Sequence, residues 1–195
     1  MKITDGEETK WETLDSVYLI RRPWLTARRD TVKLANGIVN DEFYVLEYPE
    51  WVNTIAVTKG GKFIMIRQYR HGIDGTSYEV CAGCCEEGET PEEAARRELL
   101  EETGYAGGMW REIMTVATNA SSMNNYTHCF VAEGVVEKVG DSHLEPTEEL
   151  SVFLLDEAEV LALLHGDVVK QATMAAPLWK YFYEKSCAAT ALRLP

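Results

Sequence analysis

The sequence predicts an α/β sandwich built around a mixed β-sheet, with a separate antiparallel sheet at the N-terminus. The 195 residues are 46% hydrophobic and 26% charged, a composition typical of a folded core. Strand-like segments come first along the chain, and a strongly capped helix, further strands and two more helical segments follow. Strands and helices in this order pack as layers around one core.

The first region, residues 1–50, is expected to form the antiparallel sheet. Turn signals at Pro23 and at 35–37 separate its apolar segments. The expected strands are 13–21, 30–34 and 43–46. Tyr44, Trp24 and the later Trp51 could stack on a planar ligand, although core packing is the expected role of each.

The second region, residues 51–195, is expected to be the main domain. It opens with a hairpin whose two glycines lie in the 59–62 turn between strands 52–57 and 63–67. A third strand, 77–81, is expected to lead into a glycine-bearing loop. Beyond the central helix, the sequence predicts strands at 112–118, 127–133 and 150–154, and helices at 157–164 and 170–185.

The central helix is predicted over 91–103 because its start and stop signals coincide. Thr90 can cap the N-terminus, Pro91 suits the first helical position, and Glu93 completes a capping box. Gly104 is a natural left-handed stop. The boundaries of this helix are therefore fixed by local sequence.

Three glutamates in this helix are placed against its local stability. Glu98, Glu101 and Glu102 stand at i, i+3 and i+4, so they share one face and repel one another. Two of them also lie in the last turn, where the helix dipole favours cations. A solvated acidic face is the alternative reading, but such local inconsistency is typical of functional sites. Hard oxygen ligands on one face suit Mg²⁺ or Mn²⁺.

The charge balance and the cysteines exclude several classes of function. A formal net charge of -13 argues against nucleic acid as a partner. No apolar run is long enough to cross a membrane, and the N-terminus is too polar for a secretory signal, so a cytoplasmic protein is expected. The five cysteines form no disulfide framework or zinc spacing and are expected to pack in the fold: Cys81, Cys84, Cys85, Cys129 and Cys187.

The helix and the loop before it resemble a known motif. Gly83, Glu89 and the stretch from Arg97 to Gly104 are similar to the Nudix box, and Tyr105 is the one departure, standing where an aliphatic residue is usual. The resemblance implies a Nudix-type α/β/α sandwich. It also implies divalent-metal-dependent hydrolysis of a diphosphate bond.

The resemblance assigns roles to the glutamates of the helix. Glu98 and Glu102 would bind the catalytic metal directly, and Glu101 would bind through water or join a second metal. The backbone carbonyl of Ala82 would be a further ligand. The metal would be Mg²⁺ or Mn²⁺.

Other positions match ADP-ribose and ADP-sugar pyrophosphatases. The similar stretch before the box implies that Arg70 and Glu79 contact the substrate. Arg97 and Glu89 would pair and hold the loop against the helix, which orients the metal ligands. Glu148, in a loop well after the box, would act as the general base, with Glu145 as the reserve candidate; an acidic surface loop is the competing reading.

Two departures from that subgroup leave alternatives open. Segment 119–122 stands where ADP-ribose-hydrolysing members carry a proline, and Asn125 where a glutamate is common. The expected substrate is ADP-ribose or an ADP-sugar, giving a nucleoside monophosphate and a sugar phosphate. GDP-mannose, dinucleotide polyphosphates and nucleoside triphosphates are alternatives, and a silent nucleotide-sugar sensor is another. The N-terminal sheet is expected to exchange between the protomers of a homodimer.

Overall fold

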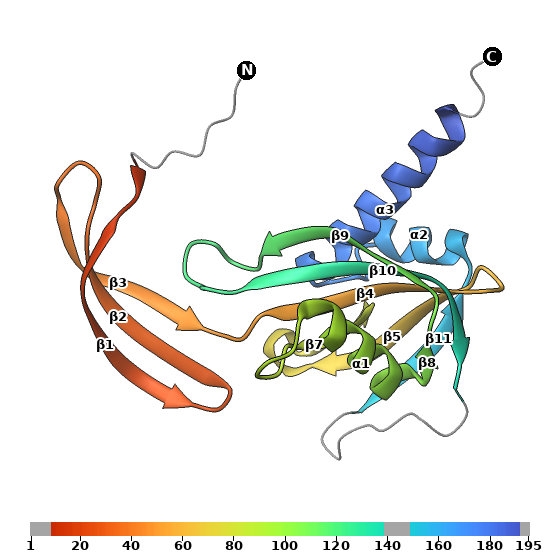
Figure 1. Ribbon diagram of the computed structural model, residues 1–195, viewed down its shortest axis with the longest axis horizontal. Helices are drawn as coiled ribbons and strands as arrows, with labels where there is room; N and C mark the ends of the chain where they lie inside the picture. Colours follow the sequence, from red (N-terminus) through yellow and green to blue (C-terminus); the bar gives the residue numbers. More distant parts are fainter. Residues whose placement is uncertain (1–8, 139–148, 192–195) are drawn as a thin grey trace. The chain divides into compact units, whose positions relative to one another are not determined.

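The computed structural model describes residues 9–138 and 149–191, with side chains as far as Ala188. The chain forms two compact units (Figure 1). One comprises residues 1–48 together with 119–125, and the other comprises residues 49–118 and 126–195. The first unit therefore takes in a loop that the sequence placed in the main domain. Each unit is described by itself.

The first unit is a three-stranded antiparallel sheet in the order β1 (Glu12–Arg22), β2 (Leu25–Lys33) and β3 (Val39–Glu47). The predicted turns lie between these strands, but β2 and β3 begin earlier than expected. Segment 119–125 is tied to the end of β3, because the Leu46 N–H donates to the Ser122 carbonyl and the Asn124 N–H donates to the Leu46 carbonyl. A loop far away in sequence thus completes this unit.

The apolar side chains of this unit are largely exposed. Every residue of β1 is exposed, and Trp24 in the following turn is 85% exposed. Tyr44 is half exposed, so the expected core packing of Trp24 and Tyr44 is wrong. A three-stranded sheet on which no other layer packs cannot bury its two faces.

The second unit contains the mixed sheet. The strand order is β11-β5-β4-β10-β8. In addition, β6 pairs with β5, β7 with β4 and β9 with β10. The β4–β10 pair is parallel, and the other strand pairs of this sheet are antiparallel. The strands are β4 (Trp51–Thr58), β5 (Phe63–Arg70), β6 (Gly75–Glu79), β7 (Cys81–Cys84), β8 (Tyr105–Ala106), β9 (Met109–Ala117), β10 (Tyr126–Glu137) and β11 (Leu150–Leu155). The helices are α1 (Pro91–Thr103), α2 (Glu157–His165) and α3 (Ala172–Ala191), with a short 3₁₀ turn at His71–Ile73.

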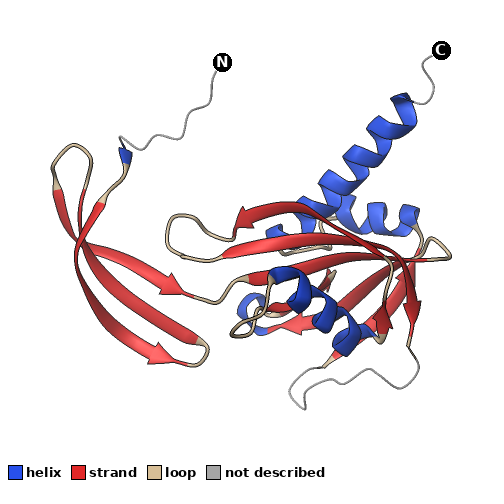
Figure 2. Cartoon of the chain, in the orientation of Figure 1, coloured by secondary structure: helices blue, strands red, loops and turns tan. Residues whose placement is uncertain are grey.

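Helices cover both faces of this sheet (Figure 2). Alternate residues of β5 point to opposite faces. Ile64 and Ile66 pack in a cluster with Leu99 of α1, whereas Phe63 and Met65 pack in the larger cluster that contains residues of α2 and α3. The predicted α/β/α sandwich with a mixed sheet is therefore confirmed.

The sequence misjudged the strands next to the central helix. The single strand expected at 77–81 is two strands, because the chain changes partner at Val80: β6 pairs β5 and β7 pairs β4. The expected glycine-bearing loop is therefore partly strand. The short β8 was not predicted, since two residues carry no periodicity and only their pairing with the end of β10 defines them. Among the described residues, no helix is long and apolar enough to cross a membrane.

Candidate active site

Helix α1 begins and ends as its local sequence predicts. The Thr90 side chain accepts a hydrogen bond from the Glu93 N–H (3.3 Å), and the Glu93 carboxylate accepts one from the Thr90 N–H (2.9 Å). Gly104 has a φ of 72° and donates its N–H to the Leu100 carbonyl. These caps fix the register of the helix and therefore the direction of its glutamates.

Glu98 lies directly against the backbone of β7. A Cβ at position 83 would collide with the Glu98 carboxylate, and φ at Gly83 is not in the left-handed region. The glycine is therefore required by the close approach of this carboxylate and not by a turn. Glu98 is accordingly held on the sheet side of α1, with a side chain that is 15% exposed.

Glu102 is one turn further along the same face. It is 7% exposed and its Oε2 accepts a hydrogen bond from the Ala82 N–H at 3.1 Å. Burial, followed by the neighbouring Glu102 charge, raises the pKa of the Cys81 thiol well above its ordinary value, so this cysteine stays protonated. Glu101 is more exposed, at 42%.

Arg97 connects these carboxylates to the loop before the helix. Its Nε and Nη2 donate to both oxygens of Glu89 at 2.8 and 3.0 Å, and Nη2 also donates to the Cys84 carbonyl at 3.0 Å. Its Nη1 bonds Glu98 and Glu101 at 2.9 and 3.0 Å. The hydrogen bonds from Arg97 lower the pKa of Glu89 to about 2. The pairing that the Nudix resemblance implies for Arg97 and Glu89 is thus present.

The residues of this region fit a divalent cation by their chemistry. The carboxylates are hard oxygen donors, and the missing Cβ of Gly83 makes the cradle in which the Glu98 carboxylate sits. Arg97 lies between Glu98 and Glu101 and bonds both of them. In residues 9–138 and 149–188, no group of three His, Cys, Asp or Glu side chains is placed to hold one metal ion. Simultaneous ligation would require rotation of these side chains. The predicted ligands remain Ala82, Glu98, Glu101 and Glu102.

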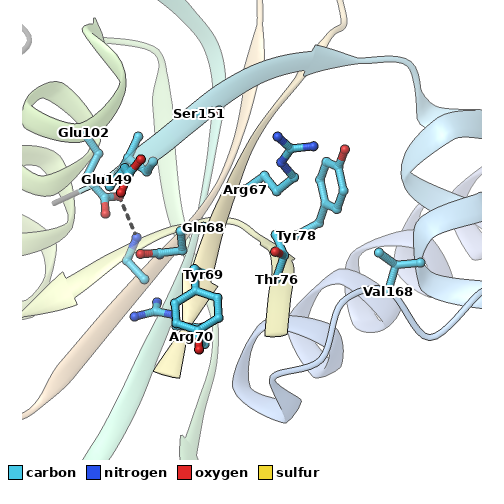
Figure 3. Close-up of a pocket in the computed structure, with 12 residues that line it drawn as sticks. Arg67, Gln68, Tyr69, Arg70, Thr76, Tyr78, Glu102, Glu149, Ser151 and Val168 are labelled. Atoms are coloured by element: carbon cyan, nitrogen blue, oxygen red, sulfur yellow. Dashed lines mark hydrogen bonds between the residues drawn. The ribbon is translucent and has the colours of Figure 1, made fainter. Parts of the chain in front are cut away.

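A cleft of about 960 Å³ opens beside Glu102 (Figure 3). Its wall comes from β5, β6, the start of β7 and the start of β11, and from the connection between α2 and α3. The lining residues are Arg67, Gln68, Tyr69, Arg70, Thr76, Tyr78, Ala82, Glu102, Glu149, Leu150, Ser151 and Val168. The predicted metal-binding and substrate-binding residues Glu102, Ala82 and Arg70 thus share one cleft.

Arg70 and Glu79 form a two-pronged ion pair at this cleft. Arg70 Nε donates to Glu79 Oε1 at 3.0 Å and its Nη2 to Oε2 at 2.6 Å, and Gln68 Nε2 donates to the same Oε2 at 3.3 Å. The Glu79 side chain is 1% exposed, whereas that of Arg70 is 42% exposed. Glu79 lies behind Arg70 and orients it, and Arg70 faces the cleft. Direct substrate contact by Glu79 stays a prediction.

The general base predicted from sequence, Glu148, and its reserve, Glu145, lie outside the described residues. The next residue, Glu149, lines the cleft and was not singled out. Its position directly after the predicted loop, one residue before β11, was the available signal. His128 faces two carboxylates across the sheet, Glu112 at Nδ1 and Glu50 at Nε2, each at 3.2 Å.

The fold and the site share one defining feature, a helix that carries several carboxylates and packs against a glycine-bearing strand. Comparison with protein families agrees. The family model of the NUDIX domain matches residues 49–175, and a second model, the nucleoside diphosphate sugar hydrolase N-terminal domain, matches residues 11–46. The chain belongs to the Nudix family of pyrophosphohydrolases, in the group that carries this N-terminal domain.

Similar proteins include bacterial enzymes. The chain is 32% identical over 146 residues to the ADP-ribose pyrophosphatase of Bacillus subtilis (strain 168), which covers 75% of this chain and 78% of that protein. It is 34% identical over 131 residues to the methanol dehydrogenase activator of Bacillus methanolicus, covering 66% and 70%. A solved structure of an ADP compounds hydrolase has the same fold, with a TM-score of 0.81, 19% identity and coverage of 94% and 98%.

Proposed function

We propose that this protein hydrolyses the pyrophosphate bond of ADP-ribose or an ADP-sugar and releases AMP and a sugar phosphate. The observation that carries the proposal is the cleft that joins Glu102 of the Nudix box, and Ala82 directly before the box, to Arg70. The 32% identity to an ADP-ribose pyrophosphatase supports the choice of base and sugar. The volume of about 960 Å³ is ample for a nucleoside diphosphate sugar, since pockets for such ligands span roughly 300–1,000 Å³.

Different residues would bind the substrate, hold the metal ion and position the metal ligands. Arg70, held by Glu79, presents its outward N–H groups to a phosphate of the substrate. Glu98, Glu101, Glu102 and the Ala82 carbonyl would hold Mg²⁺ or Mn²⁺. The chemistry that such an ion supplies is neutralisation of charge on the phosphate oxygens and a lower pKa for a bound water. Arg97 and Glu89 keep the box loop against α1, so they position these ligands.

Two neighbouring glutamates are candidates for the general base. Glu148 is the candidate from the family resemblance, and Glu149 is the neighbouring carboxylate that lines the cleft. Separate Glu148→Gln and Glu149→Gln variants distinguish them. The variant that lacks the base should lose the alkaline plateau of kcat, whereas the other should retain the wild-type pH profile.

We also propose that the protein is a homodimer joined through its N-terminal sheet. The support is the exposed apolar surface of that sheet, in which large side chains are 42–53% exposed along β1: Leu14, Val17, Tyr18, Leu19 and Ile20. Many large apolar side chains exposed on one small sheet are typical of a protein interface. A second copy of the same sheet is the partner that symmetry favours.

The proposed activity is tested by incubating the protein and Mg²⁺ with a panel of nucleoside diphosphate compounds. The panel comprises ADP-ribose, ADP-glucose, GDP-mannose, a diadenosine polyphosphate and ATP, and products are separated by anion-exchange chromatography. AMP and ribose 5-phosphate from ADP-ribose, at a kcat/KM well above the other compounds, is the expected result. Preference for GDP-mannose would overturn the base assignment. Turnover of no compound, with binding retained, would favour a sensor.

A further inference from the structure

The cleft beside Glu102 extends onto the opposite face of the sheet. Side chains of β5 alternate between the two faces, so Gln68 and Arg70 lie on the α1 side and Arg67 and Tyr69 on the other. In the described residues, the pairing of β5 with β11 ends at Gln68. Residues of both faces line the cleft at this end of β5, beyond the described pairing with β11.

Arg67 and Tyr78 form a surface on that opposite face. They are direct partners in the β5–β6 register, so their side chains are neighbours on one face. Both contact Phe153 of β11: the Arg67 guanidinium lies over its ring at 5.5 Å, and the Tyr78 ring is 5.7 Å away. Figure 3 shows the two side chains together, with Val168 across from them. We call Arg67, Thr76, Tyr78, Ser151 and Val168 the Arg67 site.

The electrostatic state of Arg67 differs from that of Arg70. The charge of Arg70 is matched by Glu79, whereas no carboxylate in the described part of the chain forms an ion pair with Arg67. A guanidinium stacked on an aromatic ring is fixed through its face, and the N–H donors at its edge remain able to bind an anion. In a chain with a net charge of -13, this unmatched cation is a local site of positive potential.

From this geometry we propose that the Arg67 site binds a phosphate monoester, a nucleoside monophosphate or a sugar phosphate, on the sheet face opposite Glu102. The guanidinium edge fits the phosphate oxygens. The hydroxyl groups of Thr76, Tyr78 and Ser151 provide further donors, and the Tyr78 and Val168 side chains provide a surface for the organic part of the ligand. The inference rests on this arrangement and is independent of the proposed substrate.

The test is equilibrium binding to the full chain by isothermal titration calorimetry, in EDTA and without divalent cations. The probes are AMP, ribose 5-phosphate and inorganic phosphate. At least one monoester should bind more tightly than inorganic phosphate, and Arg67→Gln should weaken it about tenfold or more, because a charge-assisted hydrogen bond is lost. Arg67→Lys should retain part of the affinity. Thermal unfolding of each variant verifies that it is folded.

Two control variants locate the bound anion. Arg111→Gln removes an exposed arginine of β9 that pairs with Glu184 and should bind as the wild type does. Arg70→Gln removes the cation on the other face and should have a smaller effect than Arg67→Gln. Loss of binding in Arg70→Gln with wild-type binding in Arg67→Gln would overturn the proposal. Equal affinity for all three probes, or binding of none at millimolar concentration, would overturn it as well.

Discussion

The box region, residues 83–104, and the N-terminal sheet, residues 12–47, are stabilised in opposite ways. In the box, partners are close in sequence: Thr90 and Glu93 cap each other, and Arg97 reaches Glu89 eight positions away. In the N-terminal sheet, all of β1 is exposed and its apolar side chains lack a covering layer among the described residues. The box is defined by local sequence, whereas the apolar side chains of β1 remain exposed in the described chain.

Because of this difference, the sequence predicts the geometry of the box more readily than it predicts what packs against the N-terminal sheet. Local hydrogen bonds and the close packing at Gly83 allow the box few other backbone conformations. The motif therefore predicts the arrangement of its side chains. An apolar sheet can be covered by many kinds of surface, so its sequence does not identify the partner. Four substitutions test the contrast, three in the box region and one in the sheet.

The largest effect is expected from Glu102→Gln. The change preserves shape and the hydrogen bond from the Ala82 N–H, but it removes the negative charge of a proposed metal ligand. Loss of several kcal/mol of transition-state stabilisation corresponds to about two to four orders of magnitude in kcat. Steady-state kinetics and circular dichroism measure activity and fold together. Near-normal turnover in a folded variant would refute the metal assignment.

A smaller loss is expected from Gly83→Ala. The new Cβ would occupy the place of the Glu98 carboxylate, which must move. Displacing this proposed ligand should reduce Mg²⁺ affinity or activity roughly 10- to 100-fold, as loss of a supporting contact at a metal site does. Metal titration of the activity measures this. Gly72→Ala is the matched control, because a Cβ there meets nothing within 4 Å and should change neither quantity.

In the sheet, Ile20→Lys should weaken the proposed dimer roughly tenfold or more, because a charge would be buried in an apolar interface. Light scattering coupled to size-exclusion chromatography over a dilution series measures the shift to monomer. Ile38→Lys places the same charge at an exposed apolar position between β2 and β3 and should have no such effect. A wild-type protein that is monomeric at every concentration would refute the dimer.

The smallest effect is expected from Glu89→Gln. The pKa of Glu89 is lowered to about 2 in the folded chain, from an ordinary value of 4.5. Its contribution to stability is therefore present above pH 4.5 and is lost as the pH falls toward 2. The pair is partly exposed, so a difference of about 1 kcal/mol or less is expected between wild type and variant at pH 7. Urea unfolding across pH 2–7 should show the difference shrinking on acidification.

The sequence by itself determined the features whose causes are local. The boundaries of α1 follow from Thr90, Pro91, Glu93 and Gly104, and the mutual repulsion of the glutamates on one face of the helix indicates a cation. The hairpin between β4 and β5 follows from its two glycines. Each of these depends on residues within a few positions of one another, so no tertiary contact is needed to infer them.

Only the tertiary structure decided which distant residues share the cleft. The switch of pairing at Val80 and the extent of the described β5–β11 pairing depend on long-range contacts, and local propensity carries no information about either. The burial of Glu79 behind Arg70 and the unmatched charge of Arg67 follow from that pairing, because adjacent residues of one strand face opposite sides of the sheet. The two arginines, three positions apart in sequence, thus lie in different environments.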